Sequence, residues 1–446
     1  MRPHRLLFTL IIGGLAPLSL CAPLYASGAA KTFAALKDTA FAGADFELDL
    51  AASDAASCQN ACTLSESCCA YTFASTCRLK FFAAAPTAST GSVSGAKGEC
   101  NGKAEPPTVA ERLKGKKWDL LAQKPKQDSY WRTLQILEGA SEPAFLLSAQ
   151  PFERRVLPMP MDVLDFMRAL NVIQGYSEVP LRAELPADYT ADFRAALASL
   201  PDVVKKKVSK KLKAVLLAAD VGTTGMSDSV VDDQGRPVSA FTVIDVLRTN
   251  VKANAWARSK EISPFKQDAD ETLTAEIEDP PNDTRINAIQ YILLHEFGHV
   301  LAIGENLHPR WDMPLSTSTH VGDYPFFDFS WTISADGHLK RRYTETFAGL
   351  SRIRFYHQDS SELSSSKMED VYNRLEKTDF ATLYGSTNPF DDFAEAFASY
   401  VHTVMMKRPY RIKISKAGKP VKTYGSCWEA PRCAEKRKII EALLAQ

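Results

Sequence analysis

The stretch Tyr291–Gly304, "YILLHEFGHVLAIG", places two histidines and a glutamate within an otherwise apolar segment. On an α-helix, residues four apart differ by about 40° around the axis, so His295 and His299 share one face and can bind one metal ion. Glu296 lies beside that face, where it can take a proton from water. The pattern His-Glu-x-x-His therefore predicts two ligands of Zn²⁺ and a general base, and a third protein ligand has to be found.

The flanking sequence predicts that this helix is central in its domain. Asn282, Asp283 or Thr284 can cap its first turn, and Gly304 is a suitable residue to end it. The residues between them are apolar on nearly every side, which is typical of a buried helix. Because buried histidine and glutamate side chains are costly unless they are bonded, the pattern favours a functional site.

The residues directly after the motif do not complete the ligand set of a metzincin. That extended motif, His-Glu-x-x-His-x-x-Gly-x-x-His, needs a glycine where this chain has Ala302 and a histidine where it has Glu305. Glu305 and His308 remain alternative candidates for the third ligand.

A second segment, "YGSTNPFDDFAEAFASYVHTVM" (Tyr384–Met405), predicts another long helix that carries acids. Asn388 can cap it, and the proline that follows suits a first helical turn. Asp391 and Glu395 are four residues apart and therefore share a face. Asp391 also stands three residues after the cap, where an acid favours the helix N-terminus without any metal.

The two segments "HEFGH" and "YGSTNPFDDFAEAFASYVH" together resemble the catalytic domain of the anthrax-lethal-factor-like gluzincins. The resemblance implies that Asp391 binds zinc, that Glu395 orients a zinc-bound histidine, and that Tyr384 helps to stabilise an oxyanion. The family normally has glutamate at the ligand position. Since aspartate is one methylene shorter, either the helix lies about 1.5 Å closer or Glu395 binds the metal instead.

The cysteines separate a small N-terminal module from a larger domain. The module holds "FELDLAASDAASCQNACTLSESCCAYTFASTCRLKFF", in which we expect a short helix starting at Ser53 or Asp54 and strands at "CCAYTF" and "CRLKFF". With the closing "GSVSGAKG", this stretch resembles a PAN/apple module, which implies a protein or carbohydrate ligand. A disulfide-stapled spacer without a ligand is the alternative. Cys427 and Cys433 are expected to close a local loop.

The first residues, "MRPHRLLFTLIIGGLAPLSL", have a short basic start and an apolar run too short to span a bilayer, which predicts a secretory signal peptide. A lipid anchor at Cys21 is the alternative. The cysteine content fits an exported, secreted or periplasmic protein. Lysine plus arginine and aspartate plus glutamate both total 53, so overall charge gives no argument for a nucleic-acid partner.

Three further expectations concern the large domain. Residues 161–173 and 191–219 have apolar residues at helical spacing, and the six lysines of Lys205–Lys213 are expected on a solvated helix face with Val208 and Leu212 opposite. Ser227–Val246 predicts a hairpin with a buried second strand. That strand, Val238–Val246, is the candidate edge strand that would pair with an extended substrate.

We therefore predict an α+β protein with four parts: a signal peptide (1–28), a PAN-like module (31–100), a linker (101–128) and a zincin-like metallopeptidase domain (129–446). The last is expected to be mostly helical, with a short mixed sheet and a central metal-binding helix. The predicted activity is that of an exported zinc metalloendopeptidase acting on peptides or proteins, without a transmembrane segment. A zinc amidase acting on cell-wall peptides, or a binding protein with a degenerate zinc domain, are the alternatives.

Overall fold

The computed structural model describes residues 33–41, 45–49, 54–64, 68–75, 77–80, 86–98, 118–120, 134–137, 150–174, 178–183, 185–232, 236–267, 270–311, 322–334, 338–344, 346–356 and 363–445. The expected signal peptide and Cys100 lie outside these residues. So does the expected linker, except for the short strand β6 (Trp118–Leu120).

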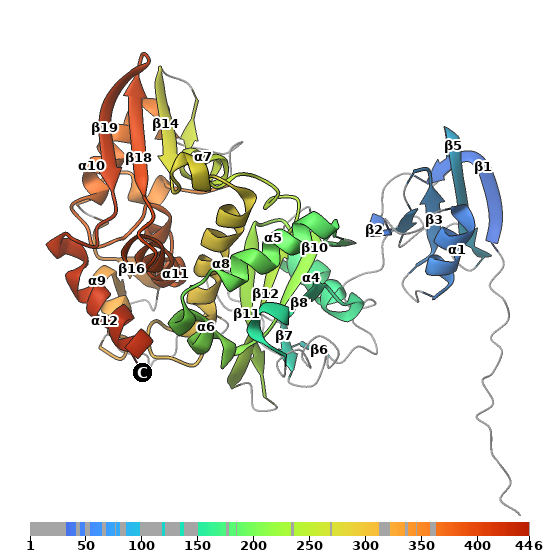
Figure 1. Cartoon of the computed structure of the whole chain (residues 1–446), viewed down its shortest axis with the longest axis horizontal. Coiled ribbons are helices and arrows are strands. Elements are labelled where there is room, and N and C mark those ends of the chain that lie inside the picture. Colours follow the sequence, from blue (N-terminus) through green and yellow to red (C-terminus); the bar gives the residue numbers. More distant parts are fainter. Residues whose placement is uncertain are drawn as a thin grey trace, which may run out of the picture.

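The N-terminal module is an antiparallel sheet with one helix (Figure 1). Its elements are β1 (Phe33–Phe41), β2 (Asp45–Asp49), α1 (Ala55–Leu64), β3 (Ala70–Phe73), β4 (Cys77–Lys80) and β5 (Pro86–Lys97). The disulfide Cys58–Cys77 ties α1 to β4, and Cys62–Cys68 ties the end of α1 to the segment before β3. The predicted helix and the two predicted strands are confirmed. A core of a few buried side chains is thin, so these cross-links stabilise the module.

A mixed sheet forms the first half of the large domain. Its strand order is β9-β10-β12-β11-β7-β6, β8 also pairs with β10, and β9 pairs with β2 of the module. The strands are β7 (Leu134–Leu137), β8 (Val156–Pro158), β9 (Leu181–Ala183), β10 (Leu212–Ala219), β11 (Gly225–Val231) and β12 (Pro237–Asp245). The pair β10–β12 is parallel, whereas β11 and β12 form the predicted antiparallel hairpin.

Helices cover both faces of this sheet. Successive side chains of β10 point to opposite faces: Leu216 packs with α4 (Met161–Gln174), and Leu217 packs with α5 (Ala187–Ala198), α6 (Asp202–Ser209) and α8 (Arg285–Ala302). The expected helix 161–173 is confirmed. The expectation of a mostly helical domain with a short sheet is not supported, because the chain is mixed α/β.

Two sequence interpretations of this region are wrong. Residues 191–219 are two helices followed by β10, and Leu212 opens that strand instead of lying on the lysine-rich helix. A strand buried on both faces is continuously apolar, so its sequence resembles a buried helix. The expected edge strand is β12, which pairs with β10 on one side and β11 on the other, so it cannot receive a substrate strand.

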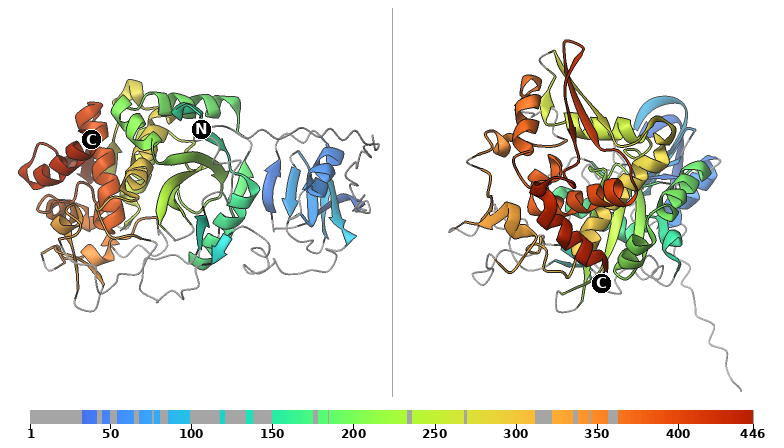
Figure 2. Two further views of the ribbon diagram at one scale, coloured as in Figure 1. Left: turned by 90° about the horizontal axis from the view of Figure 1, so that it is seen from below. Right: turned by 60° about the vertical axis from the view of Figure 1, so that its left-hand side comes forward.

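The second half of the large domain adds helices and short sheets. The helices are α7 (Ala253–Ile262), α9 (Phe327–Ser330), α10 (Met368–Leu375), α11 (Pro389–Tyr400) and α12 (Ala434–Ala445). The strand pairs are β13 (Phe265–Lys266) with β17 (Leu363–Ser364) and β15 (Trp331–Ile333) with β16 (Leu339–Arg341). The strands β14 (Glu271–Glu276), β18 (Arg411–Lys416) and β19 (Lys419–Gly425) form a sheet that projects from the domain in Figures 1 and 2. Short 3₁₀ turns, among them Tyr384–Ser386, link these elements, and a π-helical turn (Val401–Met405) extends α11.

Helix α8 is central, as predicted, and lies between the strands and α11 (Figure 1). Thr284 caps its start and Gly304, with a φ of 76°, follows its end. Lys211 donates hydrogen bonds to the carbonyl oxygens of Leu301 (3.0 Å) and Ile303 (2.5 Å), which satisfies acceptors that a helix end leaves open. One lysine of the predicted solvated face therefore caps this helix.

The described helices include none that is both long and apolar enough to cross a bilayer. Cys427 and Cys433 form the predicted local disulfide. Together with the bridges in the N-terminal module, it is compatible with an extracellular location.

Candidate metal centre

The site lies where α8 and α11 cross closely. A Cβ atom added at Gly298 would lie 2.6 Å from the Cα atom of Ala394, a separation that real Cβ atoms do not show. Glycine within the motif thus lets the backbone of α11 approach α8. This close approach is what the short side chain of Asp391 requires if it is to reach both histidines.

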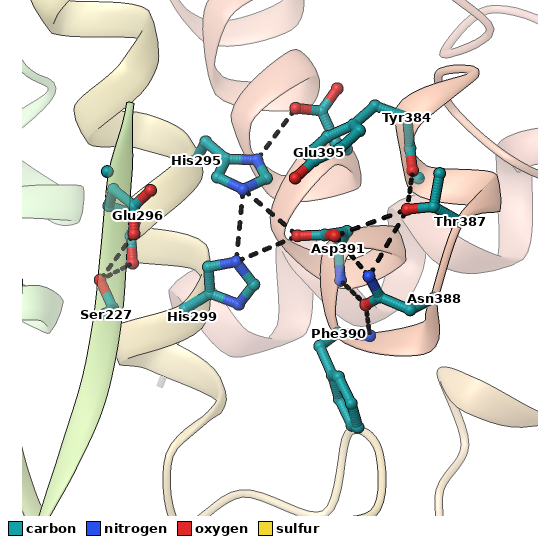
Figure 3. A network of polar contacts seen from close by, with 12 residues as sticks. Ser227, His295, Glu296, His299, Tyr384, Thr387, Asn388, Phe390, Asp391 and Glu395 are labelled. Carbon is teal, nitrogen blue, oxygen red and sulfur yellow. Dashed lines mark hydrogen bonds and ion pairs between the residues drawn. The ribbon is translucent and has the colours of Figure 1, made fainter. Parts of the chain in front are cut away.

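Three donor atoms converge between the helices (Figure 3). Nε2 of His295 lies 3.3 Å from Nε2 of His299, and Oδ1 of Asp391 lies 3.5 Å and 3.4 Å from these two nitrogens. The three side chains are mostly buried, with 12%, 14% and 14% of their surface exposed. This set could hold a metal ion.

No family model matches this chain, and no curated protein sequence matches it.

Glu395 lies behind the histidines and outside this set of donors. Its Oε1 atom accepts a hydrogen bond from Nδ1 of His295 (2.9 Å) and another from Nζ of Lys260 (2.7 Å), and its Oε2 atom accepts one from Thr382 (2.7 Å). With a metal bound, Nδ1 of His295 would keep the proton that it donates to Glu395, and the lone pair of Nε2 would face the metal. The geometry therefore favours Asp391 over Glu395 as the third ligand.

The start of α11 fixes the orientation of Asp391. The side-chain oxygen of Asn388 accepts hydrogen bonds from the backbone N–H groups of Phe390 (3.0 Å) and Asp391 (2.8 Å), as predicted for a cap. The side-chain amide of Asn388 donates to Oδ2 of Asp391 (2.5 Å). With Oδ2 held in this way, Oδ1 is the oxygen that points toward the histidines.

Glu296 lies on the side of the site that faces β11 (Figure 3), and it lines the same pocket as His295. The hydroxyl of Ser227 donates to its Oε2 atom (2.9 Å). Gly225 stands against its Oε1 atom, since a Cβ atom at Gly225 would lie only 2.7 Å from that oxygen. Burial raises the pKa of Glu296 above its usual range, although the two nearby histidines oppose this shift. Such a carboxylate is a stronger base than an exposed one.

Tyr384 borders the same pocket as His295 and Glu296. Its ring centroid lies 5.6 Å from that of His295. Burial and the nearby Asp391 keep the pKa of Tyr384 well above its usual value, so the phenol stays protonated and can donate a hydrogen bond.

Glu305 and His308, the alternative third ligands, do not lie with the three possible ligand atoms of His295, His299 and Asp391. Glu305 forms an ion pair with Lys211 (2.8 Å) at the end of α8. His308 is buried among aromatic rings and its Nδ1 atom bonds the carbonyl oxygen of Pro309 (2.8 Å). Within the described residues, His295, His299 and Asp391 form the one cluster of three side chains that could hold a metal ion.

The histidines and the acids of the site shift one another's pKa values. Burial alone would lower the pKa of His295, but its bonds to Asp391 and Glu395 outweigh burial and raise that pKa to about 10. Burial alone would raise the pKa of Asp391, but hydrogen bonds with both histidines hold it well below its usual range. The carboxylates thus stabilise a protonated His295, and the histidines stabilise an ionised Asp391.

We expect Gly298→Ala to weaken metal binding about 10-fold or more, because the new methyl group must push α11 and Asp391 away from α8. Overpacking of this kind also costs about 1–3 kcal/mol of stability. Zinc titration and thermal unfolding of the variant would measure both effects. Gly98→Ala is the matched control, since a Cβ atom there has open space. Wild-type zinc affinity in Gly298→Ala would contradict the close-approach argument.

Proposed function

We propose that the chain is a zinc-dependent metalloendopeptidase. The observation that carries this proposal is the triangle of donor atoms, whose sides measure 3.3, 3.4 and 3.5 Å. A tetrahedral zinc ion with bonds of about 2.0 Å has ligand atoms about 3.3 Å apart. Two imidazoles and one carboxylate form a ligand set that is typical of catalytic zinc and leaves a fourth position open.

The mechanism assigns a separate task to each side chain. A zinc ion held by His295, His299 and Asp391 would supply a Lewis acid that polarises a carbonyl and acidifies water. Glu296 takes the proton from the attacking water and returns it to the leaving amine. The protonated phenol of Tyr384 lies beside His295, where it can donate a hydrogen bond to the developing oxyanion.

The edge of β11 is the best candidate for binding an extended peptide. Within the described part of the chain, β7 pairs with β11 only at Val230 and Val231. The segment Gly225–Ser227 therefore has β12 as its one strand neighbour there, and it lies beside Glu296. A peptide added as a further strand would have its backbone next to the base, which favours cleavage within a chain.

Two alternative functions, a zinc amidase and a binding protein with a degenerate zinc domain, are separated from the proposed one on different grounds. A zinc amidase acting on cell-wall peptides would use the same side chains, so cleavage of an unfolded protein such as casein must be compared with cleavage of a cell-wall peptide. The complete donor triangle and the bonded Glu296 argue against a degenerate zinc domain. For the N-terminal module we propose a binding role, toward a protein or carbohydrate ligand.

We expect Asp391→Ala to weaken zinc binding more than about 100-fold and to abolish peptide cleavage. Glu395→Ala removes only a partner of a ligand, which typically costs 10- to 100-fold in metal affinity. Zinc content and competition with a chelator would measure both variants. If Asp391→Ala kept full zinc and activity, the proposed ligand set would be wrong. If the wild-type protein bound no zinc, the proposed function would fail altogether.

A further inference from the structure

Lys260 is a buried cation immediately behind the metal site. It lies on α7, has 3% of its side-chain surface exposed, and places its ammonium 2.7 Å from Oε1 of Glu395, which is itself 1% exposed. A buried ammonium costs several kcal/mol unless it is paired and hydrogen-bonded. The position is therefore an unfavourable one for lysine unless the charge is needed there.

A second carboxylate and three aromatic rings surround the ammonium of Lys260. A second buried carboxylate, Glu261, lies 4.0 Å from the ammonium and is held by the hydroxyl of Tyr372 (2.6 Å). The ring centroids of Tyr384, Trp256 and Tyr291 lie 4.9, 5.5 and 5.8 Å from Nζ. Aromatic faces at such distances favour a cation. Lys260 also lines the pocket beside Glu296 and Tyr384.

Lys260 determines what Glu395 is able to do. The oxygen that Lys260 binds is the same Oε1 that accepts the Nδ1 proton of His295, and Thr382 occupies the other oxygen. Both carboxylate oxygens are thus directed away from the three donor atoms. Without the ammonium, Glu395 would be a buried, partly paired carboxylate one turn after Asp391 on the same helix, and a metal ion would be the alternative positive charge for it to bind.

We propose that Lys260 is a positioning residue that fixes Glu395 as the hydrogen-bond acceptor of His295 and keeps it from becoming a zinc ligand. Lys260 thereby orients Nε2 of His295 toward the metal from a helix that carries no ligand. This inference deepens the proposed function and rests on it for the identity of the metal.

The test compares Lys260→Met, Glu395→Gln and the double variant in the full chain. Zinc affinity is measured by chelator competition, and the ligand field by the visible spectrum of the Co²⁺-substituted protein. Lys260→Met should lower zinc affinity about 10-fold, at the low end of what loss of such partners causes, and should reduce kcat without a matching change in KM. Its Co²⁺ spectrum should change, because Glu395 becomes available as a ligand. Lys252→Met, at the exposed start of the same helix, is the matched control.

The double variant decides between positioning and a merely structural role. If Lys260 acts through Glu395, then adding Lys260→Met to Glu395→Gln should change zinc affinity by less than about twofold. Since the double variant removes both charges of the pair, it is expected to fold even if Lys260→Met does not. Additive losses, or wild-type affinity and spectrum in Lys260→Met, would overturn the inference. A wild-type protein that binds zinc but cleaves no peptide would defeat the proposed function and leave this test intact.

Discussion

Glu296→Gln is expected to abolish peptide cleavage while the protein keeps its zinc. General acid–base catalysis contributes roughly 10²- to 10⁴-fold to a rate, so kcat should fall by about that factor. Zinc binding should persist because Glu296 is not one of the three proposed ligands and its carboxylate is held by Ser227. An amide can keep the hydrogen bond from the Ser227 hydroxyl, but it cannot take a proton from water.

The measurement pairs steady-state cleavage of an unfolded protein with zinc content. Glu305→Gln is the matched control, since it makes the same chemical change near the end of the same helix, where the carboxylate binds Lys211. Substantial cleavage by Glu296→Gln would remove Glu296 as the base. Loss of zinc in this variant would instead show that Glu296 supports the metal site, and the assigned division of roles would be wrong.

The residues of the candidate metal site could be predicted because their signals are local. Residues four apart on a helix share a face whatever the rest of the fold does, and this held for His295 with His299 and for Asp391 with Glu395. The choice between Asp391 and Glu395 depended on how closely α11 approaches α8. The spacing of residues within one helix gives no information about that distance. Gly298 was visible in the motif, but its significance required Ala394 as its neighbour.

The roles of Lys260 and Ser227 could not be predicted from local sequence patterns. Lys260 lies 135 residues before its partner Glu395, and Ser227 lies 69 residues before Glu296. A single lysine or serine has no pattern around it, and its role comes only from tertiary contact. The edge strand was misassigned for a related reason: β-branched residues mark a buried strand, but an edge is defined by the neighbours that it lacks.

Lys436→Met is expected to destabilise the domain by about 3–5 kcal/mol, because it leaves a buried carboxylate without its cation. Lys436 lies on α12 with 1% of its side chain exposed, and its ammonium lies 2.7 Å and 2.8 Å from the two carboxylate oxygens of Asp392. Trp331 donates a further hydrogen bond to the same carboxylate (2.9 Å). Asp392 directly follows Asp391, so this pair fixes the buried face of the helix that carries the proposed third ligand.

The loss should depend on pH in a defined direction. Burial raises the pKa of Asp392 to about 6 even though Lys436 opposes the shift, and removal of the lysine must raise it further. A carboxyl whose folded-state pKa exceeds its unfolded value destabilises the fold when it is ionised, so the deficit should shrink as pH falls from 7 toward 5. Denaturant unfolding at both pH values would measure this. Lys438→Met, on the exposed side of α12, is the control.

The double variant Lys436→Met with Asp392→Asn should recover much of the stability, since the buried charge is gone. An equal loss in the double variant would mean that Lys436 acts through packing and not through its charge.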